Sequence, residues 1–86
     1  MSDPNPLARP DLDVNEVADG LVVYDATTDR VHYLNQTASA VFALCTGESD
    51  EAAIAEEMGD LFGLPEVPTE STLECLRSFR AEGLLA

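Results

Sequence analysis

The sequence contains no lysine, and its positive side chains are four arginines, against 17 aspartates and glutamates. The resulting formal net charge of −13 at pH 7 repels phosphate backbones and anionic headgroups. We therefore expect neither nucleic acid nor a membrane surface as a partner. No apolar run approaches the roughly 20 residues of a transmembrane helix, and the first ten residues lack the basic and apolar regions of a secretion signal. These absences predict a cytoplasmic protein.

Histidine occurs once and cysteine twice, and no two of these residues lie at metal-ligand spacing. His32 has no nucleophile or base motif around it, and strand alternation places it opposite Val31 and Tyr33, so we expect it to face solvent. Cys45 and Cys75 fall in helix-like segments and are predicted to be buried, reduced thiols, with a disulfide or redox pair as the alternative. The five glycines form no phosphate-binding loop. The sequence thus predicts a protein that is not an enzyme and has no catalytic residue, metal or cofactor.

With 86 residues, of which 45% are hydrophobic, the chain has room for one small domain. Met1–Pro10 contains three prolines and few apolar residues, which predicts a flexible N-terminal arm that does not dock. Residues 11–86 are predicted to fold. Within them, residues 12–17, 21–24 and 30–34 are rich in branched or aromatic side chains and predict three antiparallel strands, the first at an edge.

The period then changes to that of helices. Three polar residues can cap the helices at their N-termini: Asn35, Ser49 and Ser71, the last in a capping box with Glu74. Three glycines are expected to end the helices: Gly47, Gly63 and Gly83. The apolar stripes are Ala38, Val41, Phe42 and Cys45, then Ile54, Met58, Leu61 and Phe62, then Leu73, Leu76 and Phe79. With Leu84-Leu85 folding back on the core, three strands followed by three helices predict an α+β fold.

Three of the four arginines fall on two elements that could be neighbours. Arg30 lies in the third predicted strand, and Arg77 and Arg80 flank the apolar stripe of the last helix. If that strand is an edge and the helix packs beside it, the arginines would line one groove; ordinary surface arginines are the alternative. An exposed strand edge can receive another strand, so such a groove could hold a peptide.

The order Tyr33-Leu34-Asn35-x-Thr37-Ala38, Val41-Phe42-x-Leu44 and Gly47 resembles the PqqD family, small recognition proteins first known from pyrroloquinoline quinone biosynthesis. The resemblance continues to Leu76-x-x-Phe79 and Glu82-Gly83-Leu84-Leu85 and covers about residues 11–86. The strong acidity and the Pro65–Pro68 loop depart from the family, so the founding pathway's substrate should not be assumed.

The resemblance implies a winged helix-turn-helix-like fold and a non-catalytic role. It implies binding of the leader of a ribosomally synthesised precursor peptide, as an added strand between the third strand and third helix, for presentation to a modifying enzyme such as a radical SAM maturase. Carried over by position, the peptide-binding residues would be Arg30, Val31, His32, Tyr33 and Leu34 with Leu73, Leu76, Arg77 and Arg80. The leader would carry apolar anchors and an acid facing Arg77 or Arg80.

Two other functions share this fold prediction. A winged-helix DNA-binding domain needs a basic recognition helix, whereas the helical part of this sequence carries eight acids against two arginines. An acidic protein–protein adaptor or a homodimer paired through an exposed edge strand is the other alternative, and the sequence alone does not separate it from leader recognition.

Overall fold

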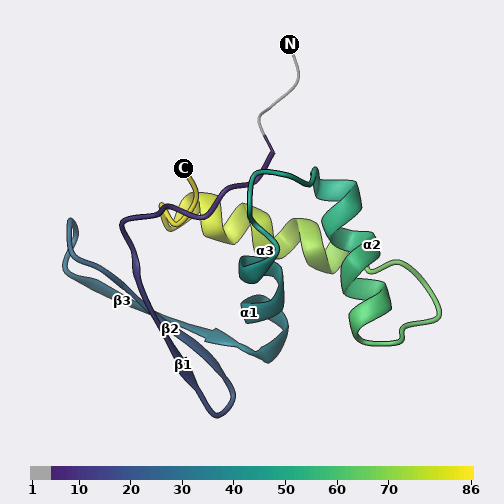
Figure 1. Ribbon diagram of the computed structural model, residues 1–86, viewed down its shortest axis with the longest axis horizontal. Coiled ribbons are helices and arrows are strands. Elements are labelled where there is room, and N and C mark those ends of the chain that lie inside the picture. The colour runs from purple at the N-terminus through teal and green to yellow at the C-terminus, as the bar shows by residue number, and fades with distance from the viewer. Residues whose placement is uncertain (1–4) are drawn as a thin grey trace.

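Three strands open the chain and three helices follow (Figure 1). The structure is a computed structural model that describes residues 5–86. The antiparallel sheet has the order β1-β2-β3, and the helices cover one of its faces. The bounds are β1 (Asp13–Val17), β2 (Gly20–Asp25), β3 (Arg30–Asn35), α1 (Gln36–Ala43), α2 (Glu51–Leu61) and α3 (Thr69–Ala81). The predicted α+β, winged helix-turn-helix-like fold is confirmed.

The register of the sheet is set at its tight ends. Val17 pairs with Gly20 across a two-residue turn, and Gly20 also pairs with Asn35 at the end of β3. A Cβ atom on Gly20 would lie 1.9 Å from the carbonyl oxygen of Leu34, so only glycine fits there. Opposed residues project on the same face, and the face that carries Val23 and Leu34 is the covered one.

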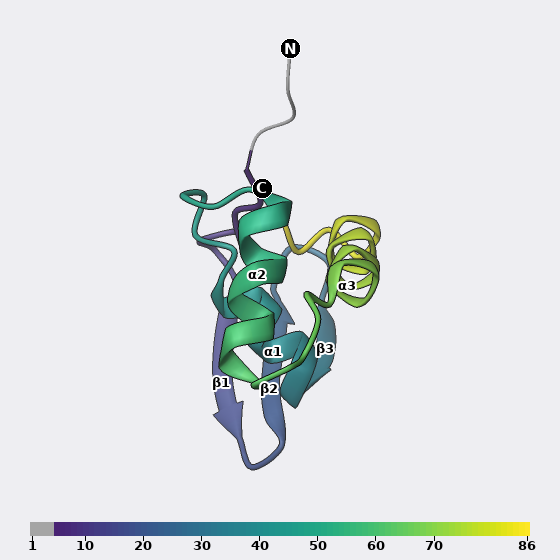
Figure 2. The same cartoon turned by 90° about the vertical axis from the view of Figure 1, so that its right-hand side faces the viewer.

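The core lies between this face and the helices, which Figure 2 shows in front of the strands. It consists of Val23, Leu34, Val41, Phe42, Cys45, Ile54, Met58, Leu76, Phe79 and Leu84. Phe42 of α1 and Phe79 of α3 pack edge to face, with ring centroids 5.6 Å apart. Leu84 folds back after Gly83, as predicted, and closes the core at the C-terminal end.

The N-terminal cap agrees with the prediction for α1 and differs from it for α2 and α3. Asn35 caps α1, its side-chain oxygen accepting a hydrogen bond from Ala38 N at 2.8 Å. Asp50 caps α2, whereas the neighbouring Ser49 was the predicted cap. The carboxylate also suits the positive end of the helix dipole. The Ser71 capping box is wrong, because α3 already begins after Pro68, which has no side-chain hydrogen bond to offer.

Two apolar stripes also end differently from the prediction. Cys45 lies beyond α1, which ends at Ala43, yet its thiol is buried and lies 3.2 Å from Val41 O. Leu61 and Phe62 are exposed, although they continue the period of Ile54 and Met58. The last turn of α2 extends past the core, and the loop that follows it covers α2 at Gly59 instead.

The predicted arm docks over residues 5–10. Ala8 N donates to Cys45 O at 2.9 Å, Arg9 N donates to Leu84 O at 3.0 Å, and Ala86 N donates to Leu7 O at 2.7 Å. These are main-chain bonds, to which every residue brings a carbonyl acceptor and every residue except proline an N–H donor, so they do not depend on side-chain composition. The expectation that this segment does not dock therefore fails here, while residues 1–4 lie outside the described residues.

Candidate functional site

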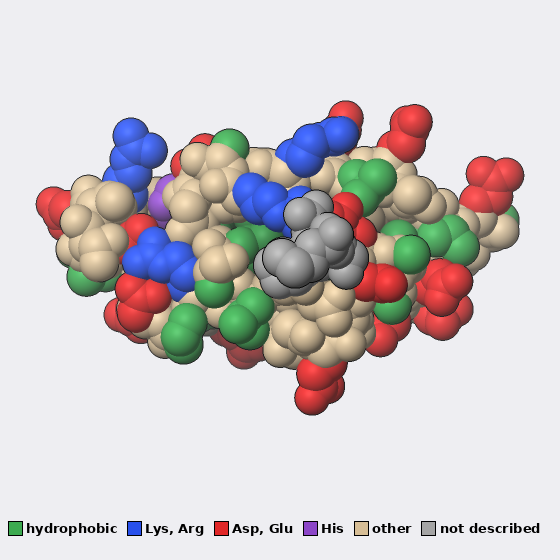
Figure 3. Space-filling view, turned by 90° about the horizontal axis from the view of Figure 1, so that it is seen from above, with side chains coloured by type: hydrophobic (Ala, Val, Ile, Leu, Met, Phe, Trp, Pro, Cys, Tyr) green, Lys and Arg blue, Asp and Glu red, His purple; other side chains and the backbone are tan. Residues whose placement is uncertain are grey.

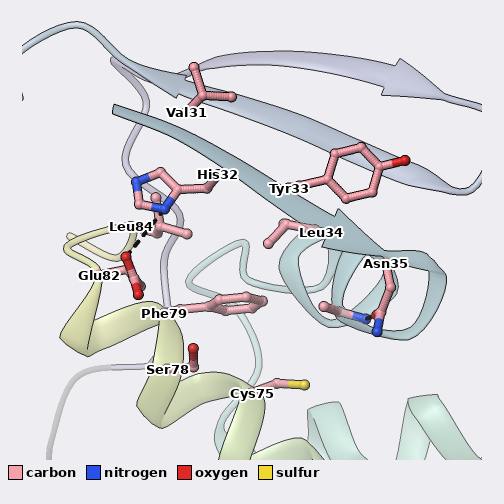
Figure 4. Close-up of a pocket in the computed structure, with 11 residues that line it drawn as sticks. Val31, His32, Tyr33, Leu34, Asn35, Cys75, Ser78, Phe79, Glu82 and Leu84 are labelled. Atoms are coloured by element: carbon pink, nitrogen blue, oxygen red, sulfur yellow. Dashed lines mark hydrogen bonds and ion pairs between the residues drawn. The ribbon is translucent and has the colours of Figure 1, made fainter. Parts of the chain in front are cut away.

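A groove of about 460 Å³ lies between β3 and α3. Figure 4 shows His32 and Leu34 pointing from β3 towards α3, with the Phe79 ring reaching up from the helix and Val31 turned away. We call this the β3–α3 groove. Its lining residues are Val31, His32, Tyr33, Leu34, Asn35, Ala38, Cys75, Ser78, Phe79, Glu82 and Leu84.

Local sequence holds both walls in place. β3 passes into α1 without a connecting loop, because Asn35 both ends the strand and caps the helix. Ser39 Oγ donates to Leu34 O at 3.1 Å and ties this junction. On the other wall, Cys75, Ser78, Phe79 and Glu82 follow i, i+3, i+4 and i+7 spacing, so one face of α3 looks into the groove.

β3 is an edge strand. Among residues 5–86 it pairs only with β2, on one side. In an antiparallel pair, alternate residues direct their N–H and C=O groups towards the partner, and the residues between direct theirs to the other edge. The free edge of β3, beside α3, therefore offers backbone donors and acceptors to an incoming strand.

His32 spans the groove rather than facing solvent. Its side chain is 10% exposed, and Nδ1 lies 3.3 Å from Oε2 of Glu82, the residue that follows α3 (Figure 4). The Glu82 side chain is 45% exposed, and the two groups form an ion pair whenever the imidazole is protonated. Its Nε2 is buried and has no hydrogen-bond partner among the described residues. The alternation itself is correct, since Val31 and Tyr33 are on the opposite face and both 65% exposed. The prediction that His32 faces solvent is wrong because the helices cover the face of β3 that carries His32.

Arg9 ties the N-terminal segment to the rest of the domain through side-chain hydrogen bonds. Its guanidinium donates to both carboxylate oxygens of Asp11, to Asp25 Oδ2 at 2.9 Å and to Gly83 O at 2.9 Å. Hydrogen bonds from the Thr27 hydroxyl and backbone and from Arg9 lower the pKa of the buried Asp25 to about 2, against the opposing effect of burial. This Arg9 cluster links three segments that are distant in sequence.

The structure brings together four of the nine predicted peptide-binding residues: Val31, His32, Tyr33 and Leu34. The other five do not line the groove: Arg30, Leu73, Leu76, Arg77 and Arg80. Leu76 is fully buried in the core, and Arg80 is paired with Glu51 of α2 at 3.0 Å. At 100° per residue, Arg77 is about 200° around the helix from Cys75, on the far side of α3.

Seven lining residues were absent from the prediction: Asn35, Ala38, Cys75, Ser78, Phe79, Glu82 and Leu84. A signal for the helical ones was present, because Cys75, Phe79 and Glu82 form a regular stripe beside the Leu76 stripe. The arginines Arg77 and Arg80 lie on another face of the same helix, and the charge pattern therefore indicated that face. Glu82 and His32 are the groove's carboxylate and imidazole, and no arginine lines it.

The two thiols are free and have no sign of nucleophilic activation. Burial raises the pKa of Cys45 to about 11 and also raises the pKa of Cys75, which lines the groove. A reactive thiol needs the opposite shift. In the part of the chain that the structure describes, no group of three or more histidine, cysteine and acidic side chains could hold a metal ion. Nor is any helix there long and apolar enough to cross a bilayer.

Comparison with known proteins gives one match. The family model described as coenzyme PQQ synthesis protein D (PqqD) matches residues 20–85, which include β2, β3, all three helices and every residue of the groove. No curated protein and no solved structure matches the chain.

Proposed function

The chain belongs to the PqqD family, and we propose that it binds the leader of a ribosomally synthesised precursor peptide and presents it to a modifying enzyme. Members of this family are non-catalytic accessory proteins and are generally peptide-binding partners of such an enzyme. The observation that carries the proposal is the free edge of β3 beside a largely neutral groove of about 460 Å³.

The leader would add to β3 as a fourth strand. Main-chain hydrogen bonds to the free edge would supply affinity without regard to side chains, and the groove would select alternate side chains of the leader. Leu34, Ala38 and Phe79 form the apolar part of a lining that also holds His32, Asn35, Ser78 and Glu82, and we propose that the leader places apolar anchors two residues apart on this apolar part. Arg77 and Arg80 are turned elsewhere, which removes the basis for an acidic leader residue opposite them.

The partner enzyme would carry out the chemical modification, and we propose that this partner is a radical SAM maturase. By holding the leader, the chain would keep the modifiable part of the precursor near the partner's active site, at effective concentrations on the order of millimolar for a short linker. This role requires no catalytic group and no cofactor in the chain itself. It also implies work in the cytoplasm, where precursor peptides are translated.

Isothermal titration of the full chain with leader peptides from short genes beside its own tests the proposal. We expect micromolar or tighter binding. N-methylation of single leader residues should weaken binding at every second position, by roughly 2- to 13-fold for each lost hydrogen bond. This leaves the protein unchanged, so a loss of affinity cannot come from a misfolded variant.

Two results would overturn the proposal. The first is that no neighbouring leader binds. The second is that N-methylation has equal effects at successive positions, which would show that the leader does not pair as a strand with β3.

A further inference from the structure

A second, smaller pocket lies among the three helices. Its volume is about 210 Å³, and its lining is Thr37, Val41, Met58, Phe62, Leu64, Pro68, Ser71 and Thr72. None of these residues lines the β3–α3 groove. The two surfaces are therefore distinct.

The segment that supplies Phe62 and Leu64 to this pocket is rich in exposed apolar side chains. Leu61, Phe62, Leu64 and Val67 are 64%, 40%, 45% and 50% exposed. They are four of the nine large hydrophobic residues that are exposed among residues 5–86, and they fall within seven consecutive positions. Such a concentration is typical of an interaction surface. We call the pocket and these four residues the α2–α3 patch.

The loop that carries the patch is held in place. Leu64 N donates to Gly59 O at 2.9 Å, and Thr69 N donates to Val67 O at 2.8 Å. Pro68 packs directly on α2, since a Cβ atom on the buried Gly59 would lie 3.4 Å from Pro68 Cδ. A surface ordered in advance loses less conformational entropy when a partner binds.

The size of the pocket limits what it can accept. Small-molecule sites usually measure roughly 300–1,000 Å³, whereas a cavity of about 150 Å³ is known to hold one benzene ring. At about 210 Å³ the pocket suits a single side chain of the size of leucine, methionine or phenylalanine. One buried anchor of this kind, surrounded by weaker contacts, is the usual organisation of a protein–protein interface.

The charge around the patch limits the partner further. Between Arg30 and Arg77 the sequence has no lysine or arginine and nine acidic residues, among them Asp60, Glu66 and Glu70 beside the patch. Figure 3 shows hydrophobic side chains interleaved with acidic ones towards the end of the molecule that carries the α2–α3 loop. A second copy meeting the patch through its own patch would bring these acids together, and nucleic acid or anionic lipid would be repelled.

We infer that the α2–α3 patch docks the modifying enzyme, which inserts one apolar side chain into the pocket and surrounds the patch with lysine and arginine. The inference rests on the proposed function, because a domain that presents a bound peptide needs a second surface for the enzyme. Opposite charges across the rim would speed the encounter, and the anchor would give most of the affinity.

Two exposed serines on α3 allow a matched test. Ser71 lines the patch pocket and Ser78 lines the β3–α3 groove. Ser71→Leu should fill the pocket, and Ser78→Leu should fill the groove. Each variant is the control for the other, because both make the same change on the same helix. Retained chemical-shift dispersion in each variant shows that it is folded.

The probe is a capped alanine–arginine peptide with one central phenylalanine, titrated into the isotope-labelled full chain. A second peptide has alanine in place of phenylalanine. We expect the phenylalanine peptide to bind at least about tenfold more tightly, since burial of such a side chain is worth this ratio or more. Its shifts should centre on Thr37, Met58 and Ser71. Ser71→Leu should abolish the difference between the peptides, and Ser78→Leu should leave it unchanged.

The same variants are then titrated with the leader and with the enzyme encoded beside the chain. Ser71→Leu should weaken enzyme binding at least about tenfold without changing leader affinity. Ser78→Leu should weaken leader binding and, in an enzyme titration without leader, leave enzyme affinity unchanged. Equal affinity for the two peptides, or full enzyme affinity in Ser71→Leu, would overturn the docking inference alone. If both variants bind leader as tightly as the wild type, the result contradicts leader binding in the groove. It leaves the inference about the α2–α3 patch unaffected.

Discussion

Replacing His32 with leucine should make the chain more stable. The imidazole is 10% exposed, and its buried Nε2 has no hydrogen-bond partner among the described residues. In the neutral tautomer with its proton on Nδ1, towards Glu82, this nitrogen is an unused acceptor. In the other tautomer and in the protonated imidazole it is an unused donor. Leucine has a similar size, lies on the same strand face as Leu34 and brings no polar atom into the site.

Two opposing effects determine the size of the change. A buried polar group without a partner costs roughly 1–3 kcal/mol of folding free energy. The lost contact with Glu82, whose side chain is 45% exposed, is worth at most about 1 kcal/mol because solvent screens it. With the contact taken at its upper limit, His32→Leu should raise the free energy of unfolding by about 0–2 kcal/mol. In a domain of this size that corresponds to a melting temperature up to roughly 16 °C higher.

Urea denaturation followed by circular dichroism measures this difference, with an unchanged slope showing that the unfolded state is comparable. Glu82→Gln is the matched control, which removes only the charged partner and should change stability by less than about 1 kcal/mol. A loss of more than about 1 kcal/mol in His32→Leu would refute the reasoning. If the stabilised variant also binds leader more weakly, the unpartnered nitrogen serves the peptide site.

Three further predictions concern other positions. Because the pKa of Asp25 is lowered to about 2 from 3.8, its stabilising contribution is complete above 3.8 and is lost as the pH falls through about 2. The difference in urea midpoint between wild type and Asp25→Asn should therefore shrink across that window, and a pH-independent difference would contradict the assignment. Cys75 lines the groove and burial raises its thiol pKa, so iodoacetamide should alkylate it slowly, and still more slowly with leader bound; equal rates would place the leader elsewhere. Gly20→Ala forces a methyl group against a β3 carbonyl and should cost roughly 3 kcal/mol, whereas Gly63→Ala, with open space and only a positive φ to accommodate, should cost about 1 kcal/mol by thermal denaturation. Similar losses in both glycine variants would show that the clash is relieved elsewhere.

Much of the fold was visible in local patterns. Alternation in residues 30–34 and the cap at Asn35 predicted β3 and the start of α1, and Gly63 and Gly83 mark the ends of the last two helices, whereas α1 ends at Ala43, before the expected stop at Gly47. These features depend on neighbours a few residues apart, which interact in the same way wherever the segment lies in the fold. The family resemblance rested on the same local order, and the family match confirmed it.

The composition of the groove depended on long-range packing. Periodicity states which residues share a face, but it does not state which face another element will cover. The side chains of His32 and Leu34 face α3 because the helices pack on their side of the sheet, and those of Val31 and Tyr33 are exposed on the opposite face. The rotation of α3 is set by the burial of Leu76 and Phe79, and this turns Arg80 towards α2 instead of the groove.

The sequence by itself thus determined the order of the elements, most of their ends, the negative field around them and the family. Only the tertiary structure decided which side of β3 is buried, which stripe of α3 meets it, how the N-terminal segment docks and where a second apolar pocket opens. The physical reason is the range of the interactions involved. Propensity, capping and alternation act between close neighbours in the chain, whereas a groove is formed by surfaces from distant segments whose relative rotation is chosen by the packing of the whole core.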